Sequence, residues 1–179
     1  MKYTFDEKDY NSNDGMMTSI WGPPLWHVLH TISFNYPIRP TKKQKEHYYN
    51  YFKNLKNILP CKYCRDNYKN NLKESKFGKR VFKNRNTLSK WVFKLHNCVN
   101  KNLGKKCNLT YKMVRERYEH FRSRCIIETK EKSKIENGCV ESLYGLKSKC
   151  TLNIIPRSDK TKSFTVDPKC ILKKLNKNK

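Results

Sequence analysis

The chain has 179 residues, with 40 Lys and Arg against 15 Asp and Glu, and a formal net charge of +25. This length fits one compact domain with some residues to spare. The first residues lack the apolar stretch of a secretory signal, and no apolar run approaches the roughly 18 residues of a membrane span. We therefore expect a protein of the cytoplasm that is neither secreted nor inserted in a membrane. The charge favours acidic partners, including nucleic acid, although no nucleic-acid-binding motif accompanies it.

The first half of the chain is predicted to contain two helices after a polar N-terminal arm at residues 1–20. The first helix is predicted to begin at Trp21, because the two prolines that follow are tolerated in a first turn, and to end near Pro37. The second is predicted to start after Thr41, a suitable N-cap, and to carry apolar residues at helical spacing as far as Leu59.

Three further helices are predicted before residue 126. One starts at Pro60, one covers about 87–103 and one covers about 110–125, with a loop at 77–85. The spacing shows no alternation of strand and helix. The expected fold is therefore all-α, a four-helix bundle with a short fifth helix.

Residues 126–179 differ from the rest and form a basic tail that contains cysteines. The tail opens with a mixture of charged residues and later holds a strand-like run at 151–156. We expect it to be irregular: an extended arm, a small hairpin, or a disordered segment held by two or three disulfide bridges. The domain division is then 1–20, 21–125 and 126–179.

The sequence Cys61-Lys62-Tyr63-Cys64 lies where the third helix is predicted to begin. The free N–H groups and the dipole of a helix start stabilise a thiolate, so this pair indicates redox or metal chemistry. Structural zinc needs four ligands, and although His27 and His30 have suitable spacing, nothing completes a second pair. A thioredoxin-like dithiol belongs in a βαβ unit, which the helical setting does not provide.

A flavin that accepts two electrons from the dithiol is the third interpretation. Such a cofactor needs a slot with aromatic faces and a few polar groups. Two predicted helices offer these groups, largely at a spacing of four: Trp26, His30, His96, Asn97 and Asn100. Lys101 and Lys105 follow and suit the pyrophosphate of the cofactor.

Several motifs occur together in one order. They are Trp21-Gly22-Pro23 with Trp26, Leu29-His30-Thr31, Leu59-Pro60-Cys61-x-x-Cys64, Trp91, His96-Asn97-x-Val99-Asn100, Leu103-Gly104-Lys105 and a Tyr-rich last helix. In this combination the chain resembles the Erv/ALR family of FAD-linked sulfhydryl oxidases over about residues 20–125. The resemblance is greatest to the short forms encoded by large cytoplasmic DNA viruses.

The resemblance implies a thiol oxidase that binds FAD in a helical bundle and forms a homodimer. Electrons would pass from the thiols of protein substrates through Cys61 and Cys64 to FAD and then to O₂, giving H₂O₂. Cys61 would receive the incoming thiol and Cys64 would face the flavin. The implied FAD contacts are Trp21, Trp26, His30, Cys64, His96, Asn97, Asn100, Lys101, Lys105 and Tyr118. The place of action would be the host cytoplasm or the virion.

Six cysteines lie outside the motif, and their pairing is left open. Many family members have a structural disulfide whose first cysteine falls where this chain has Phe93; Cys98 and Cys107 lie nearby and either pair or remain free. Cys139 and Cys150 are candidates for a shuttle pair or a structural disulfide, with Cys125 and Cys170 in reserve. No metal is expected. The competing hypothesis is a basic nucleic-acid-binding or structural module with zinc or structural cysteines.

Overall fold

The computed structural model describes residues 6–123 and 138–171. Within these ranges the secondary structure is helical, and an isolated bridge between Ser123 and Ser142 is the only β-type pairing. The helices are α1 (Glu7–Tyr10), α2 (Thr18–Phe34), α3 (Lys42–Ile58), α4 (Lys62–Glu74), α5 (Arg85–Asn102) and α6 (Tyr111–Glu119), with 3₁₀ turns η1 (Lys79–Lys83) and η3 (Pro168–Cys170). The predicted all-α fold is confirmed.

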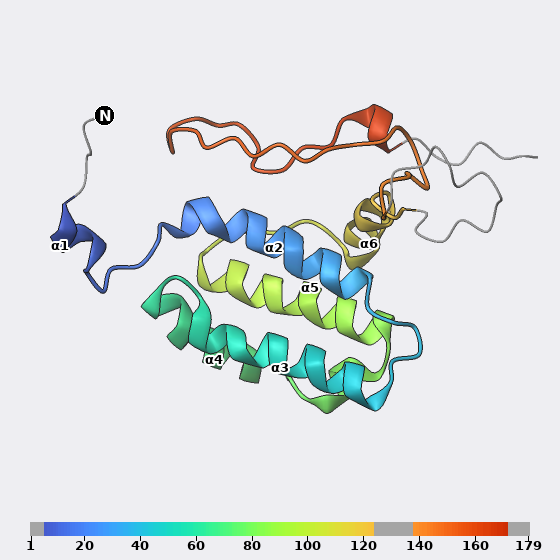
Figure 1. Ribbon diagram of the computed structural model, residues 1–179, viewed down its shortest axis with the longest axis horizontal. Helices are drawn as coiled ribbons and strands as arrows, with labels where there is room; N and C mark the ends of the chain where they lie inside the picture. The colour runs from blue at the N-terminus through green and yellow to red at the C-terminus, as the bar shows by residue number, and fades with distance from the viewer. Residues whose placement is uncertain (1–5, 124–137, 172–179) are drawn as a thin grey trace, which may run out of the picture.

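The four long helices α2 to α5 form the bundle, and α6 lies against α2 and α5 (Figure 1). Their apolar faces meet in a core that includes Leu29, Phe52, Leu88, Val92 and Leu95. Burial of these side chains is the main favourable contribution to folding. The core places the start of α4 near the start of α2, so the cysteine pair lies at one end of the bundle (Figure 1).

Side-chain caps account for where α3 and α5 begin. Thr41 caps α3 in a reciprocal pair with Gln44, as its position before the apolar pattern predicts. Asn84 makes the same kind of pair with Thr87, so α5 begins at Arg85, two residues before the predicted start. The predicted loop at 77–85 contains η1, because Phe82 is buried in the core.

The N-terminal region is more ordered than the predicted loose arm. Asp6 caps the short α1, and α2 begins at Thr18 rather than at Trp21. The prolines at 23 and 24 therefore lie inside α2, near its N-terminal end. The earlier start is stabilised by the indole of Trp21, whose Nε1 donates to the Met16 carbonyl at 2.9 Å.

The last bundle helix is shorter than the predicted 110–125, since α6 ends at Glu119. Arg122 lies beyond its end, pairs with Glu119 and donates from Nη2 to the Phe34 carbonyl at 2.9 Å. The chain thus leaves α6 to close the C-terminal end of α2, which the helical periodicity does not reveal.

Residues 138–171 form an irregular segment that runs beside α2 (Figure 1). The N–H of Leu146 donates to the Lys169 carbonyl at 3.0 Å, which joins the two ends of a long loop. The strand-like run at 151–156 forms no strand: these residues have no ladder partner within the described ranges, and Leu152 is 63% exposed. No helix in the described parts of the chain is long and apolar enough to cross a membrane.

Candidate active site

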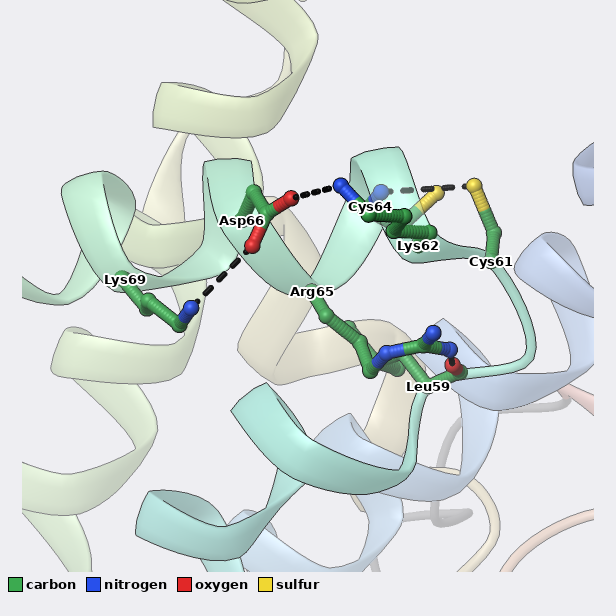
Figure 2. Close-up of polar contacts among 7 residues, drawn as sticks. All are labelled: Leu59, Cys61, Lys62, Cys64, Arg65, Asp66 and Lys69. Carbon is green, nitrogen blue, oxygen red and sulfur yellow. Dashed lines mark hydrogen bonds and ion pairs between the residues drawn. The ribbon is translucent and has the colours of Figure 1, made fainter.

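The cysteine pair occupies the first turn of α4 (Figure 2). Cys61 is the N-cap residue, and the backbone N–H of Cys64 donates to its sulfur at 3.3 Å. Both cysteines are free thiols and both are partly buried. The predicted position at a helix start is therefore confirmed, and the sulfur of Cys61 takes the place that a hydroxyl or carboxylate usually takes in an N-cap.

The two thiols differ in acidity. Burial opposes ionisation of Cys61, but hydrogen bonds from the side chain and backbone of Cys64 and from the backbone of Tyr63, together with the charge of Arg65, lower the pKa of Cys61. Burial, the hydrogen bond to Cys61 and the charge of Cys61 raise the pKa of Cys64 to about 11. In the reduced pair Cys61 is thus the more acidic thiol, and of the two it is the one that ionises first as the pH rises.

Arg65 is the cation whose charge favours ionisation of both cysteines, and it also fixes the preceding loop. Its Nη1 donates to the Leu59 carbonyl at 2.6 Å (Figure 2). The guanidinium therefore cannot swing freely into solvent. Sequence reasoning missed this residue, although its place directly after Cys64 is a usable signal for a stabilised thiolate.

The chain before α2 lies against the backbone that leads into Cys61. The N–H of Met16 donates to the Pro60 carbonyl at 2.8 Å. A Cβ on Gly15 would lie 2.8 Å from that carbonyl oxygen and 3.1 Å from Cα of Cys61. Residues 15 and 16 therefore pack directly on the backbone of the redox motif.

A cluster of rings joins α2, α5 and α6 and contains four of the predicted cofactor contacts. The rings of Trp26 and His96 stack with their centroids 4.0 Å apart and an interplanar angle of 4°. Nε2 of His30 lies 3.1 Å from Nδ1 of His96, and the ring of His30 stacks on Tyr118 at 5.2 Å. The spacing of four in the sequence correctly placed Trp26 and His30 toward His96.

Both histidines of this cluster are held neutral. Burial lowers the pKa of His30 to about 3, with further contributions from the nearby His96 and His27. Burial and the positive charge of Lys105 lower the pKa of His96 to about 4. Neutral rings are suited to stacking against another planar ring system without introducing a buried charge.

His27 adds a ring to the cluster that the sequence did not assign to it. It packs 5.6 Å from Tyr118, and its Nδ1 is buried and makes no hydrogen bond within the described residues; the same is true of Nδ1 of His30. In the sequence, the spacing of three between His27 and His30 indicates only a zinc pattern. No group of three or more His, Cys, Asp or Glu in the described ranges could hold a metal ion.

The predicted FAD contacts outside the ring cluster lie in different parts of the bundle. The charge of Lys105 lies close enough to His96 to affect the ionisation of that ring. The backbone N–H of Lys105 donates to the Asn100 carbonyl at 2.8 Å. Lys101 instead pairs with Glu74 of α4 at 3.6 Å, on another face of α5. Trp21 lies with Leu59 and Pro60 around an apolar hollow at the cysteine end of the bundle. Asn97 is partly buried on α5.

Of the cysteines outside the motif, neither Cys98 and Cys107 nor Cys139 and Cys150 form a disulfide with each other. Cys98 is buried and Cys107 exposed, and both are free thiols. Cys139 is disulfide-bonded whereas Cys150 is free, so these two are not joined to each other. Cys170 is also free, and Cys125 lies outside the described residues.

The family model for Erv1/Alr matches residues 23–119, which contain the cysteine pair and the rings of α2, α5 and α6. The chain belongs to the Erv1/Alr family. The resemblance expected from the motifs is thus confirmed.

Two viral members of the Erv1/Alr family illustrate the similarity. A probable FAD-linked sulfhydryl oxidase of Acanthamoeba polyphaga mimivirus is 40% identical over 91 residues, which are 51% of this chain and 63% of that protein. A putative FAD-linked sulfhydryl oxidase of Invertebrate iridescent virus 6 is 31% identical over 90 residues, 48% of this chain and 81% of that protein. The chain therefore matches less than two thirds of the mimivirus relative.

A solved Erv1/Alr structure has the same helical arrangement. The FAD binding domain of Erv1 from Saccharomyces cerevisiae superposes with a TM-score of 0.52 at 26% identity, covering 57% of this chain and 94% of that domain. Most of that domain is thus represented here. The tail at 138–171 lies beyond the part that the family model matches.

Proposed function

We propose that this chain is an FAD-linked thiol oxidase that forms disulfide bonds in protein substrates. The observation that carries the proposal is the pair of unequal thiols, Cys61 and Cys64, at the start of α4. Such a pair exchanges disulfides with other thiols. The membership of the Erv1/Alr family and the names of the viral relatives support the same activity.

The ring cluster fits FAD as the electron acceptor. Trp26, His30, His96 and Tyr118 present aromatic faces, and the unpartnered Nδ1 atoms of His27 and His30 can bond polar atoms of a ligand. Lys105 beside His96 supplies positive charge for phosphates. FAD bound there would take two electrons from the dithiol and pass them to O₂, giving H₂O₂.

Asn97, Asn100 and Cys64 also belong to the proposed FAD contacts, since Asn97 and Asn100 share α5 with His96. Trp21 lines the apolar hollow beside Pro60, and Lys101 pairs with Glu74 of α4. We therefore assign these two residues to the surroundings of the cysteine pair and to the α4–α5 contact.

The cysteines perform the thiol chemistry in two steps. A substrate thiolate attacks Sγ of Cys61 in the oxidised pair, which breaks the bond between Cys61 and Cys64, forms a mixed disulfide and releases Cys64 as a thiolate that is then protonated. A second substrate thiolate then attacks the substrate sulfur. The substrate leaves as a disulfide and Cys61 leaves as a thiolate, stabilised by the N–H of Cys64 and by Arg65.

The proposal includes a homodimer that acts on protein thiols in the host cytoplasm or the virion. The viral origin of the two relatives supports this location. Residues 21–125 would form the oxidase domain, with 1–20 and 126–179 as additions to it. Light scattering on the purified protein measures the oligomeric state directly.

The deciding experiment is purification followed by a spectrum and an oxygen-uptake assay. We expect a yellow protein with noncovalently bound FAD that consumes O₂ in the presence of a dithiol or a reduced protein. The variant Cys64→Ser should keep FAD and lose turnover, whereas Cys107→Ser, at an exposed thiol, should keep both. A colourless protein without thiol-dependent uptake, which instead binds DNA in a salt-dependent way, would establish the competing basic binding module.

A further inference from the structure

The tail beyond the family domain contributes a ring to the proposed cofactor site. The ring of Phe164 lies 5.3 Å from that of His27 on α2 and 6.2 Å from that of Phe121 after α6. The contact brings residue 164 to a helix that lies more than a hundred positions earlier in the sequence. It is a long-range contact that no helical pattern predicts.

The position of Phe164 is fixed from both sides. The guanidinium of Arg117 on α6 lies 5.4 Å from the centre of the Phe164 ring, within the range of a cation–π contact. Phe164 is half-buried, whereas Leu152 and Ile154 of the same loop are exposed. Phe164 therefore makes a contact that these apolar side chains of the loop do not make.

The ends of the loop are held on the bundle, so the contact is not that of a free arm. The N–H of Leu146 donates to the Lys169 carbonyl, and a Cβ on Gly145 would lie 2.6 Å from the carbonyl carbon of Cys170. The N–H of Leu143 donates to the Arg122 carbonyl at 3.0 Å, just after α6. These contacts anchor the base of the loop beside α6.

The rings form one continuous series from the tail to the proposed FAD contacts. Phe164 packs on His27, His27 on Tyr118, and Tyr118 on His30. His30 in turn meets His96 and Trp26. Phe164 thus covers the outer side of the same cluster that we assign to the cofactor.

We propose that Phe164 is a cofactor-retaining residue: the tail holds its ring against His27 and closes the α2–α6 side of the FAD site. This inference rests on the proposed function. By filling the outer side of His27, Phe164 keeps His27 and Tyr118 packed and water out of the ring cluster. Without the ring the protein should still bind FAD but release it faster.

The test is the rate of FAD release from the full-length protein, followed by the fluorescence of free flavin after dilution. Phe164→Ala should release FAD roughly 3- to 10-fold faster than the wild-type chain, the scale set by one aromatic contact. Phe164→Tyr keeps the ring and should release at close to the wild-type rate. Leu152→Ala, at an exposed position of the same loop, is the matched control and should not differ from wild type.

Arg117→Met provides a second variant that leaves Phe164 in place but removes its cation–π partner, and it should accelerate release in the same direction. Far-UV circular dichroism of the apo proteins identifies any variant that fails to fold. Wild-type release rates in both Phe164→Ala and Arg117→Met would overturn the inference while leaving the oxidase intact. A wild-type chain that binds no FAD would overturn the proposed function as well.

Discussion

Nε2 of His30 lies 3.1 Å from Nδ1 of His96, although the two residues are 66 positions apart. One ring donates and the other accepts, so the contact needs neutral imidazoles or a single extra proton. It joins α2 to α5 in the middle of the ring cluster.

The protein should lose stability as the pH falls below about 6.5. Burial lowers the pKa of His30 to about 3 and of His96 to about 4, so in acid the unfolded chain binds protons that the folded chain does not. Their stabilising contribution is present above the unfolded pKa of 6.5 and decreases toward pH 3. At pH 4.5 the loss should be roughly 2 kcal/mol for each histidine.

Urea unfolding of the apo protein at pH 7 and pH 4.5 measures this loss. His30→Gln and His96→Gln should each reduce the dependence of stability on pH, because one titrating group is removed. His47→Gln, at an exposed position of α3, is the control and should keep the wild-type dependence. If the stability of both His30→Gln and His96→Gln depends on pH as steeply as that of the wild type, these two histidines do not cause the loss of stability in acid.

In the reduced protein Cys61 should react with iodoacetamide at a lower pH than Cys64. Hydrogen bonds from Cys64 and Tyr63 lower the pKa of Cys61, while burial and the thiolate of Cys61 raise the pKa of Cys64 to about 11. Mass spectrometry of samples alkylated at a series of pH values separates the two thiols. Exposed Cys107 serves as an internal reference, and preferential labelling of Cys64 would reverse the roles proposed here.

Arg65→Met should slow the reaction of Cys61 with iodoacetamide at neutral pH. The substitution removes a positive charge that favours the thiolate and a hydrogen bond to the Leu59 carbonyl. Loss of that bond should also cost about 1 to 2 kcal/mol of unfolding free energy. Lys69→Met, which removes an exposed cation of the same helix, is the matched control. Equal effects of the two substitutions would show that only net charge matters.

Tyr36→Phe should destabilise the bundle by about 1 to 2 kcal/mol, because its buried hydroxyl donates to the Phe82 carbonyl at 2.9 Å. The hydrogen bond links the end of α2 to η1. Tyr10→Phe, at an exposed position, should leave the free energy of unfolding unchanged. Urea denaturation measures both, and a Tyr36→Phe protein of wild-type stability would argue against this link.

Gly15→Ala should make Cys61 easier to alkylate. The added Cβ would lie 2.8 Å from the Pro60 carbonyl oxygen, so the segment must move away and its hydrogen bond from Met16 must lengthen or break. Gly22→Ala is the control, because its Cβ would meet no atom within 4 Å. If both variants react at the wild-type rate, residues 15 and 16 do not restrict access to the thiol.

The long helices and the inner part of the site could be predicted because they depend on local signals. Thr41 caps α3 as expected, and residues four apart on one helix face turn the same way, which is why Trp26 and His30 lie together. The cysteine pair at a helix start follows from Pro60 and the change of apolar pattern. These signals lie within a few residues of the features that they predict.

Features that depend on contacts between distant segments could not be predicted. Lys101 and Lys105 carry the same side chain, so the sequence predicts the same phosphate-binding role for both. Only the position of Glu74 on α4 shows that Lys101 forms an ion pair there instead. The chain after α6 is held by the hydrogen bond from Arg122 to the Phe34 carbonyl. The position of Phe164 is set by the contact of its ring with His27. In each case the partner lies far along the chain, where periodicity carries no information.

The closed base of the C-terminal loop makes its far end a convenient place for a label. Residues 156–159 form an exposed turn in which the N–H of Asp159 donates to the Pro156 carbonyl at 3.0 Å. Because Leu146 and Lys169 already hold the loop ends together, added residues at this turn enlarge a loop whose closure cost rises only slowly with length. A fluorophore or a short affinity tag inserted there would report on the protein without altering either cysteine of the redox pair.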